Sequence, residues 1–224
     1  MSETAPLPAE LRAVLPDDTQ VAWQLLAPIL PTELYLAGGT GVVVHLGHRI
    51  SRDLDFFYHS GVVDLGALSK QIAAAGPFAV TLEGEGTLRG LLGETKLEFL
   101  HADEVAPQRQ LEIPKSVAGI RVAGLKDLLA MKLKVVRERG EMRDYFDIMA
   151  IDESGPYNVE EGIVFWLERY GIAPQSEYLQ MLITSLGYLD DVEPDDSLPI
   201  DLDKLARWWR RRQIVVIRNL GRNA

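Results

Sequence analysis

The sequence contains no cysteine among its 224 residues. This absence excludes disulfides, zinc sites built on thiolates and catalysis by a cysteine nucleophile. No apolar run reaches the roughly 18 residues that a membrane-spanning helix needs, and the first residues lack the basic start and apolar core of a signal peptide. The chain also has no internal repeat, heptad pattern or low-complexity tract. We therefore expect a cytoplasmic globular protein that does not associate with a membrane.

Charge is distributed unevenly along the chain. The net charge of −10 argues against a protein that coats nucleic acid non-specifically. Residues 190–203 nevertheless carry seven acidic residues, and residues 207–222 carry six arginines and no acid. A local basic strip of this kind can bind RNA at one place. The acidic and basic blocks can equally pair with each other or with a partner protein.

Residues 35–57 hold the two features that carry the most chemistry. The first is a glycine pair followed by a hydroxyl, Gly38-Gly39-Thr40; glycine lets a backbone come close to a phosphate and turn its N–H groups towards it. The second is Asp53 and Asp55, which point to the same face of an expected strand, about 6–7 Å apart along it. Such a pair suits divalent cations that lie about 4 Å apart. Each feature alone is typical of a turn or of a solvated strand edge, but together they indicate transfer of a nucleotidyl group.

The same stretch resembles the opening motif of the AbiEii/AbiGii-type nucleotidyltransferases, which include MenT-like toxins and are similar to the DNA polymerase β superfamily. In that family an Arg-x-Ser-x-Asp-(Leu/Ile)-Asp-Phe segment follows the glycine loop, and here it spans Arg49 to Phe56 and includes Ser51. The resemblance continues through Lys132, the Arg-Asp-x-x-Asp at 143–147 and an acidic tract near residue 190, so it covers most of the chain. It implies a toxin of a bacterial or archaeal toxin–antitoxin or phage-defence system, with an antitoxin protein as partner.

Hydrophobic periodicity and turn residues predict an α+β fold in two parts. Residues 1–123 read as a mixed sheet with flanking helices, and residues 124–224 read as a helical lobe. The resemblance implies the same arrangement, a polymerase β-like nucleotidyltransferase core with the metal site followed by a helical C-terminal lobe. Helices are expected at 7–15, 18–29, 41–48, 65–75, 125–138, 141–152, 159–170, 175–187 and 202–219. Strands are expected at 33–37, 52–58, 78–83, 87–92, 96–101 and 119–122.

The helix expected at 125–138 places Lys132 in the middle of an apolar stripe. A lysine there needs an acidic or phosphate partner, or must extend to solvent. Lys134 points the opposite way and is expected on the surface. The family resemblance implies that Lys132 binds the β- or γ-phosphate of a nucleoside triphosphate.

Asp144 and Asp147 lie three residues apart on the next expected helix, opposite an apolar face. Their spacing alone favours a solvated helix face. The resemblance instead implies that one of them is required for function and orients Lys132 or the acceptor. We take Asp144, which follows Arg143, as the first choice of the two.

Polymerase β-type sites usually add a third carboxylate on a neighbouring strand, and Glu98 is the candidate for that metal ligand. A surface pair between Lys96 and Glu98 is an equal alternative. Arg49 suits a phosphate contact because a guanidinium group can donate two parallel hydrogen bonds to phosphate. Thr40 and Ser51 are expected to help the glycine loop bind phosphates.

The sequence therefore predicts a nucleotidyltransferase that uses a nucleoside triphosphate, depends on Mg²⁺ or Mn²⁺ and releases pyrophosphate. Asp53 and Asp55 hold the metal in this interpretation. The toxin resemblance implies an RNA acceptor, the 3′ end of tRNA in particular, and a block of translation. Transfer to a small molecule, as in antibiotic-modifying enzymes, or to a protein would use the same metal site. A non-catalytic binding module that keeps the fold is the alternative of another class, and the joint presence of both aspartates and the glycine loop disfavours it.

Overall fold

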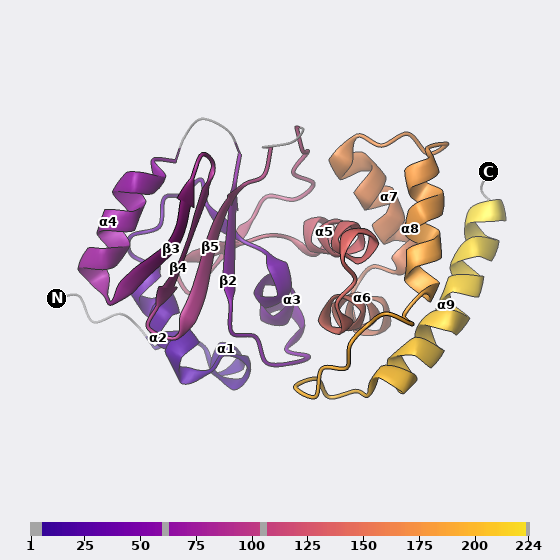
Figure 1. Cartoon of the computed structure of the whole chain (residues 1–224), viewed down its shortest axis with the longest axis horizontal. Helices are drawn as coiled ribbons and strands as arrows, with labels where there is room; N and C mark the ends of the chain where they lie inside the picture. The colour runs from indigo at the N-terminus through magenta and orange to yellow at the C-terminus, as the bar shows by residue number, and fades with distance from the viewer. Residues whose placement is uncertain (1–5, 60–62, 104–106, 223–224) are drawn as a thin grey trace. The chain divides into compact units, whose positions relative to one another are not determined.

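The computed structural model describes residues 6–59, 63–103 and 107–222, and the chain divides into two compact units (Figure 1). Unit 1 comprises Met1–Gln108 and Ile113–Gly124. Unit 2 comprises Arg109–Glu112 and Leu125–Ala224. A short stretch ahead of the helical part thus belongs to unit 2, although unit 1 continues after it. Among the described residues, no helix is both long and apolar enough to cross a membrane.

Unit 1 is built on a mixed sheet whose strand order is β3-β4-β5-β2-β1-β7-β6. Its strands are β1 (Tyr35–Leu36), β2 (Leu54–Tyr58), β3 (Phe78–Gly84), β4 (Thr87–Leu92), β5 (Thr95–His101), β6 (Lys115–Val117) and β7 (Ile120–Val122). Its helices are α1 (Ala9–Val14), α2 (Asp17–Leu26), α3 (Gly38–Leu46) and α4 (Leu65–Ala75). β2 runs parallel to β5, and β1 runs parallel to β7. The other neighbouring strands are antiparallel.

The main core of unit 1 lies on one face of β2. Leu54, Phe56 and Tyr58 are buried there, and Phe56 stacks on Phe99 of β5 with ring centroids 5.1 Å apart. The helices α2 and α4 contribute buried side chains to the same core, and α4 contacts β3 and β4 (Figure 1). Because side chains alternate along a strand, the residues between these three point to the other face. Asp55 is one of them.

The helix α3 begins at Gly38, three residues earlier than the sequence predicts. The expected glycine loop is therefore the first turn of this helix, which follows β1 after Ala37 alone. Gly38 has φ +59°, a left-handed conformation that glycine adopts without steric cost. The helix ends at Gly47, which is also left-handed and donates its N–H to the carbonyl of Val43.

Unit 2 is helical in its described residues. Its helices are α5 (Leu125–Glu138), α6 (Met142–Ser154), α7 (Val159–Tyr170), α8 (Glu177–Gly187) and α9 (Leu202–Arg222). α5 contacts α6, α7 and α8, and α9 packs against the same three helices. α7 begins with a capping box, in which Asn158 and Glu161 each bind the other's backbone N–H, and ends at left-handed Gly171.

The predicted fold class is confirmed: a mixed sheet with flanking helices precedes a helical part. The helices predicted at 65–75, 125–138 and 159–170 and the strand predicted at 87–92 have those bounds, and the other predicted elements appear with shifts at their ends. β6 is the strand that the sequence does not predict. It has three residues, pairs with β7 at the edge of the sheet and exposes Lys115 and Ser116, so it has no buried alternation for a pattern to detect.

Candidate active site

Gly38 brings the start of α3 against the carboxylate of Asp55. A Cβ at position 38 would overlap Oδ2 of Asp55 and lie 3.0 Å from its Cγ. The N–H of Ala37 donates to the carbonyl of Asp55 at 2.8 Å, which joins the two segments by their backbones. Glycine is therefore required at position 38 both by its left-handed φ and by the carboxylate beside it.

Thr40 and Ser51 connect the first turn of α3 to the segment that carries the aspartates. Their hydroxyl oxygens are 2.6 Å apart, and Thr40 also donates to the carbonyl of Asp53. Both side chains are buried, Thr40 to 1% and Ser51 to 7% exposure. The direct phosphate contact predicted for these hydroxyls stays a prediction. The contacts in the structure give them a positioning role, because they fix the backbone of Asp53 relative to Gly38.

Asp53 and Asp55 both lie on the less buried side of the β2 segment. Asp53 precedes the strand and Asp55 is its second residue, between buried Leu54 and Phe56. In the parallel pairing with β5, Asp55 is opposite Glu98. Glu98 is thus the carboxylate beside the aspartate pair, on the strand where a third ligand was expected.

Glu98 also forms an ion pair within the sheet. Nε of Arg89 on β4 lies 3.5 Å from its Oε1, and the two side chains are 45% and 34% exposed. Arg89, rather than Lys96, is the cation that the structure places with Glu98. The assignment of Glu98 as a third metal ligand stays a prediction.

Asp53, Asp55 and Gly38 are the residues that could hold a divalent metal ion together with a nucleotide, and this role stays a prediction. The described residues contain no group of three or more His, Asp or Glu side chains arranged to hold a metal ion. Mg²⁺ is usually bound by one or two carboxylates plus substrate phosphates and water, so a complete protein cage is not needed. The missing Cβ of Gly38 leaves space beside Oδ2 of Asp55 that any other residue would fill.

Arg49 follows α3 and precedes the two aspartates in the sequence, and it is half-buried. Its Nη1 donates to the carbonyl of Ile50 at 3.0 Å. Its contact with a phosphate stays a prediction.

In unit 2, Lys132 is buried and paired with two carboxylates. Its Nζ lies 2.8 Å from Oδ1 of Asp144 and 2.7 Å from Oδ2 of Asp147, and the residue is 6% exposed. Of the outcomes left open for this lysine, an acidic partner is therefore the one observed. Nε of Arg139 lies 3.6 Å from the other oxygen of Asp144, so the group contains two cations and two carboxylates.

The solvated helix face considered for Asp144 and Asp147 is wrong. The two residues are 1% and 0% exposed, because α6 packs against α5 on one side and α9 on another. The neighbouring Tyr145 donates its hydroxyl to the carbonyls of Ser185 and Tyr188 at 2.8 and 3.0 Å. Burial, and secondly the charge of Asp144, raise the pKa of Tyr145 to about 12.

Sequence reasoning missed a second buried ion pair in unit 2. Asp127 and Arg169 are 1% exposed each and contact one another. Asp127 also accepts hydrogen bonds from the N–H groups of Leu111 and Glu112, at 3.0 and 2.8 Å. Burial raises the pKa of Asp127, although these hydrogen bonds and the arginine oppose the change. At 100° per residue Asp127 lies opposite the apolar stripe of α5, so the hydrophobic pattern carried no signal of its burial.

One arginine of the basic strip is a structural residue. Arg212 is 15% exposed and donates two 2.9 Å hydrogen bonds to Asp152 of α6 as well as bonds to Glu160 of α7. Burial alone would raise the pKa of Glu160, but hydrogen bonds from Arg212 and Asn219 outweigh it, so that pKa is lowered. The basic strip is therefore smaller at the surface than in the sequence.

Comparisons with known proteins agree on one family. A family model described as the nucleotidyl transferase AbiEii toxin of type IV toxin–antitoxin systems matches residues 23–207. The uncharacterized protein aq_aa25 of Aquifex aeolicus is 26% identical over 164 residues, which are 73% of this chain and 77% of that protein.

Solved structures share the fold at low sequence identity. JHP933 from Helicobacter pylori superposes with a TM-score of 0.57 and 18% identity, over 97% of this chain and 96% of that one. MenT4, a nucleotidyltransferase toxin from Mycobacterium tuberculosis, superposes with a TM-score of 0.53 and 16% identity, over 90% of this chain and 86% of that one. Because the family match spans most of the residues from α2 to α9, the chain belongs to the AbiEii nucleotidyltransferase toxins and is a nucleotidyltransferase.

Proposed function

We propose that this nucleotidyltransferase transfers a nucleotide from a nucleoside triphosphate to the 3′ end of an RNA, tRNA in particular, in a Mg²⁺-dependent reaction that blocks translation. Family membership supports a toxin and an antitoxin partner. The RNA acceptor is proposed from the same membership. The observation that carries the chemistry is the close approach of Gly38 to the carboxylate of Asp55.

The residues of unit 1 supply the parts that this transfer needs. The acceptor hydroxyl loses its proton to solvent as its oxygen attacks the α-phosphorus, the bond from that phosphorus to the oxygen that bridges it to the β-phosphate breaks, and pyrophosphate leaves. Asp53 and Asp55 hold the Mg²⁺, which when bound polarises the α-phosphate and offsets the charge that develops on pyrophosphate. The N–H groups at the start of α3 face the triphosphate, as helix N-termini do in many phosphate sites. Thr40 and Ser51 keep Asp53 in place against that turn.

The remaining predicted residues keep the roles that the resemblance implies. Arg49 contacts a phosphate, and Glu98 is the third carboxylate. Lys132 binds the triphosphate, and Asp144 or Asp147 orients Lys132 or the acceptor. The ion pairs of Lys132 with both aspartates support the orientation of the lysine.

The test is transfer of label from each α-³²P nucleoside triphosphate to total RNA with Mg²⁺. The wild-type protein is compared with Asp53→Asn/Asp55→Asn, which keeps side-chain size and removes both charges. The matched control is Asp17→Asn/Asp18→Asn, an exposed aspartate pair in the first turn of α2. We expect label in tRNA-sized RNA with the wild type and the control, a loss of at least about a thousandfold in the Asp53/Asp55 variant, and loss of translation when the labelled tRNA is used in a cell-free system.

Two results would overturn parts of the proposal. If no RNA is labelled but triphosphate plus Mg²⁺ raises the melting temperature, the acceptor is a small molecule or a protein. If neither labelling nor stabilisation occurs, the chain is a non-catalytic module that keeps the fold.

A further inference from the structure

The outer face of α9 combines arginines with exposed aliphatic residues. Asp203, Arg207, Arg211, Ile214 and Arg218 follow one another at helical spacings of three or four residues, so they share one face, and all are exposed. Ile214 is 58% exposed, and the adjacent Val215 and Ile217 are 41% and 51% exposed. The three arginines of this face make no ion pair with any residue in the described ranges. This face thus leaves both charge and apolar area open to a partner.

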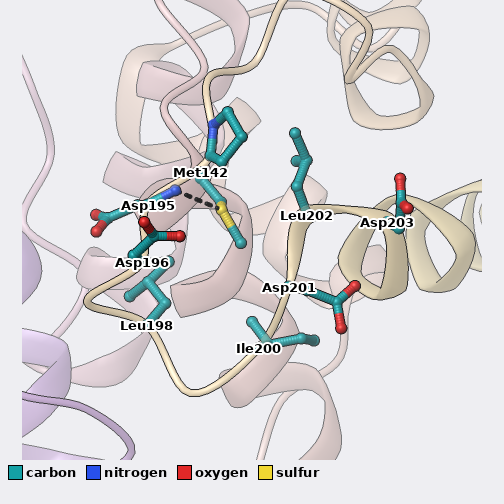
Figure 2. Close-up of a pocket in the computed structure, with 9 residues that line it drawn as sticks. Met142, Asp195, Asp196, Leu198, Ile200, Asp201, Leu202 and Asp203 are labelled. Carbon is teal, nitrogen blue, oxygen red and sulfur yellow. Dashed lines mark hydrogen bonds between the residues drawn. The ribbon is translucent and has the colours of Figure 1, made fainter.

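An acidic hollow lies at the start of the same helix. Figure 2 shows Met142, Leu198, Ile200 and Leu202 around it, with aspartates on its rim. Its volume is about 480 Å³, enough for several side chains. Its acidic residues are Asp195, Asp196, Asp201 and Asp203.

The acids of the hollow differ in what they do. Asp195 accepts from Ser197, and Asp201 accepts from the N–H of Lys204, so these two close turns of their own segment. Asp196 and Asp203 are exposed and make no ion pair within the described part of the chain. An apolar floor with an unneutralised acidic rim fits a partner surface that is basic and aliphatic.

The outer face of α9 has that chemistry, which makes unit 2 complementary to itself. In a two-fold dimer, the outer face of α9 of each copy contacts the acidic hollow of the other copy. The symmetry therefore produces the same contact twice. If two α9 helices run antiparallel with the axis at the level of Leu205, Asp203 of each copy lies opposite Arg207 of the other. Arg211 and Ile214 then lie about 9–14 Å from the axis, at the level of the hollow.

RNA fits the same face less well. Single-stranded nucleic acid is usually bound by basic grooves with aromatic side chains on which bases stack. Both tryptophans of α9 are engaged inside the unit: Trp209 is fully buried, and Nε1 of Trp208 donates to Glu153 at 2.7 Å. The side chains exposed between the arginines are isoleucine and valine, which add to a protein interface and not to base stacking.

We propose that the protein forms a two-fold dimer in which the outer face of α9 packs against the acidic hollow of a second copy. The contact lies wholly within unit 2 and does not depend on the transfer reaction. Its energy comes from burial of the exposed aliphatic residues of α9 against the hollow of the second copy, and the charge pairs next to the axis fix the antiparallel orientation.

Charge reversal tests this arrangement directly. The mass of the purified full chain is measured by sedimentation equilibrium from about 1 to 50 μM, in low and moderate salt. The variants are Asp203→Arg, Arg207→Asp and the double variant; the control is Lys70→Asp, an exposed lysine on α4. Circular dichroism verifies that each variant is folded.

The wild type and the control should give about twice the monomer mass of 24.9 kDa. Each single reversal creates two like-charge contacts per dimer and should raise the dimer Kd roughly ten- to a hundredfold. The double variant restores opposite charges in both contacts, and its Kd should return to within about threefold of wild type.

Each other outcome would overturn the proposal. A wild type that is monomeric over the whole range, or a dimer whose Kd the single reversals leave unchanged, excludes this interface. A double variant as weak as the single ones excludes the pairing of Asp203 with Arg207. A monomer in which Arg207→Asp lowers retention on immobilised RNA would instead assign the face to RNA.

Discussion

Replacing Lys132 with methionine removes the ammonium group that lies 2.8 Å from Asp144 and 2.7 Å from Asp147. The side chains of all three residues are at most 8% exposed, so the group belongs to the buried class of ion pairs. Removing one partner of a buried pair costs about 3–5 kcal/mol, because the charge that stays behind has lost its compensation. At about 2–4 °C per kcal/mol for a chain of this size, the melting temperature should fall by roughly 6–20 °C.

The matched control is Lys134→Met on the same helix. Lys134 is 36% exposed and lies 3.9 Å from Glu138, so its loss should cost less than about 1 kcal/mol. Both variants are measured by thermal and urea unfolding. A double-mutant cycle of Lys132→Met with Asp147→Asn should give a coupling energy of about 1–3 kcal/mol. If the two lysine variants lose equal stability, or the cycle is additive, the reasoning about a buried charge group is refuted.

Three further changes test other contacts. Gly38→Ala should lower the rate of nucleotide transfer at least about tenfold and the free energy of unfolding by roughly 1–3 kcal/mol, because its Cβ would overlap Asp55. This loss of stability comes in addition to the backbone strain that Gly47→Ala, the control, also introduces at a position where no atom lies within 4 Å of the new Cβ. Equal melting temperatures of the two variants would argue against the overlap. Thr40→Val removes the partner of the Asp53 carbonyl and of the Ser51 hydroxyl and should cost about 1–3 kcal/mol by urea unfolding; a cost under about 0.5 would count against its positioning role. Burial raises the pKa of Tyr145 from 10.0 to about 12, so its contribution is complete below pH 10 and is lost as pH rises towards 12. Wild type should therefore lose roughly 2 kcal/mol more than Tyr145→Phe between pH 9 and 12, and parallel pH profiles would contradict this.

Local pattern was enough to predict every helix and every strand except β6, and not enough to predict which strands pair. The end of the helix at 65–75 could be predicted because Gly76-Pro77 follows it, and the structure adds the cap that Asp64 forms at its start. The order of the strands could not, since the parallel pairing of β2 with β5 joins residues more than forty positions apart. The opposition of Asp55 and Glu98 follows from that pairing and becomes visible only in the folded sheet.

Burial of charged residues was the other feature that could not be predicted from the sequence. Spacing alone placed Asp144 and Asp147 on a solvated face because it describes one helix, and α6 is covered on more than one side. Lys132 could be recognised as unusual from the apolar stripe around it. Its acidic partners come from another helix, so the sequence left the choice between pairing and solvent open.

The path of the chain through residues 109–112 limits how this protein can be divided or recombined. A fragment that begins at Leu125 would lack the two backbone N–H groups bound by Asp127 and the Arg109 carbonyl bound by Arg169. A fragment that ends at Gln108 would lack β7, and β1 would lose one of its two neighbours. No single cleavage therefore releases both halves with their hydrogen bonds complete. For the same reason, gene fusion or shuffling can exchange the helical half only if this four-residue stretch moves with it.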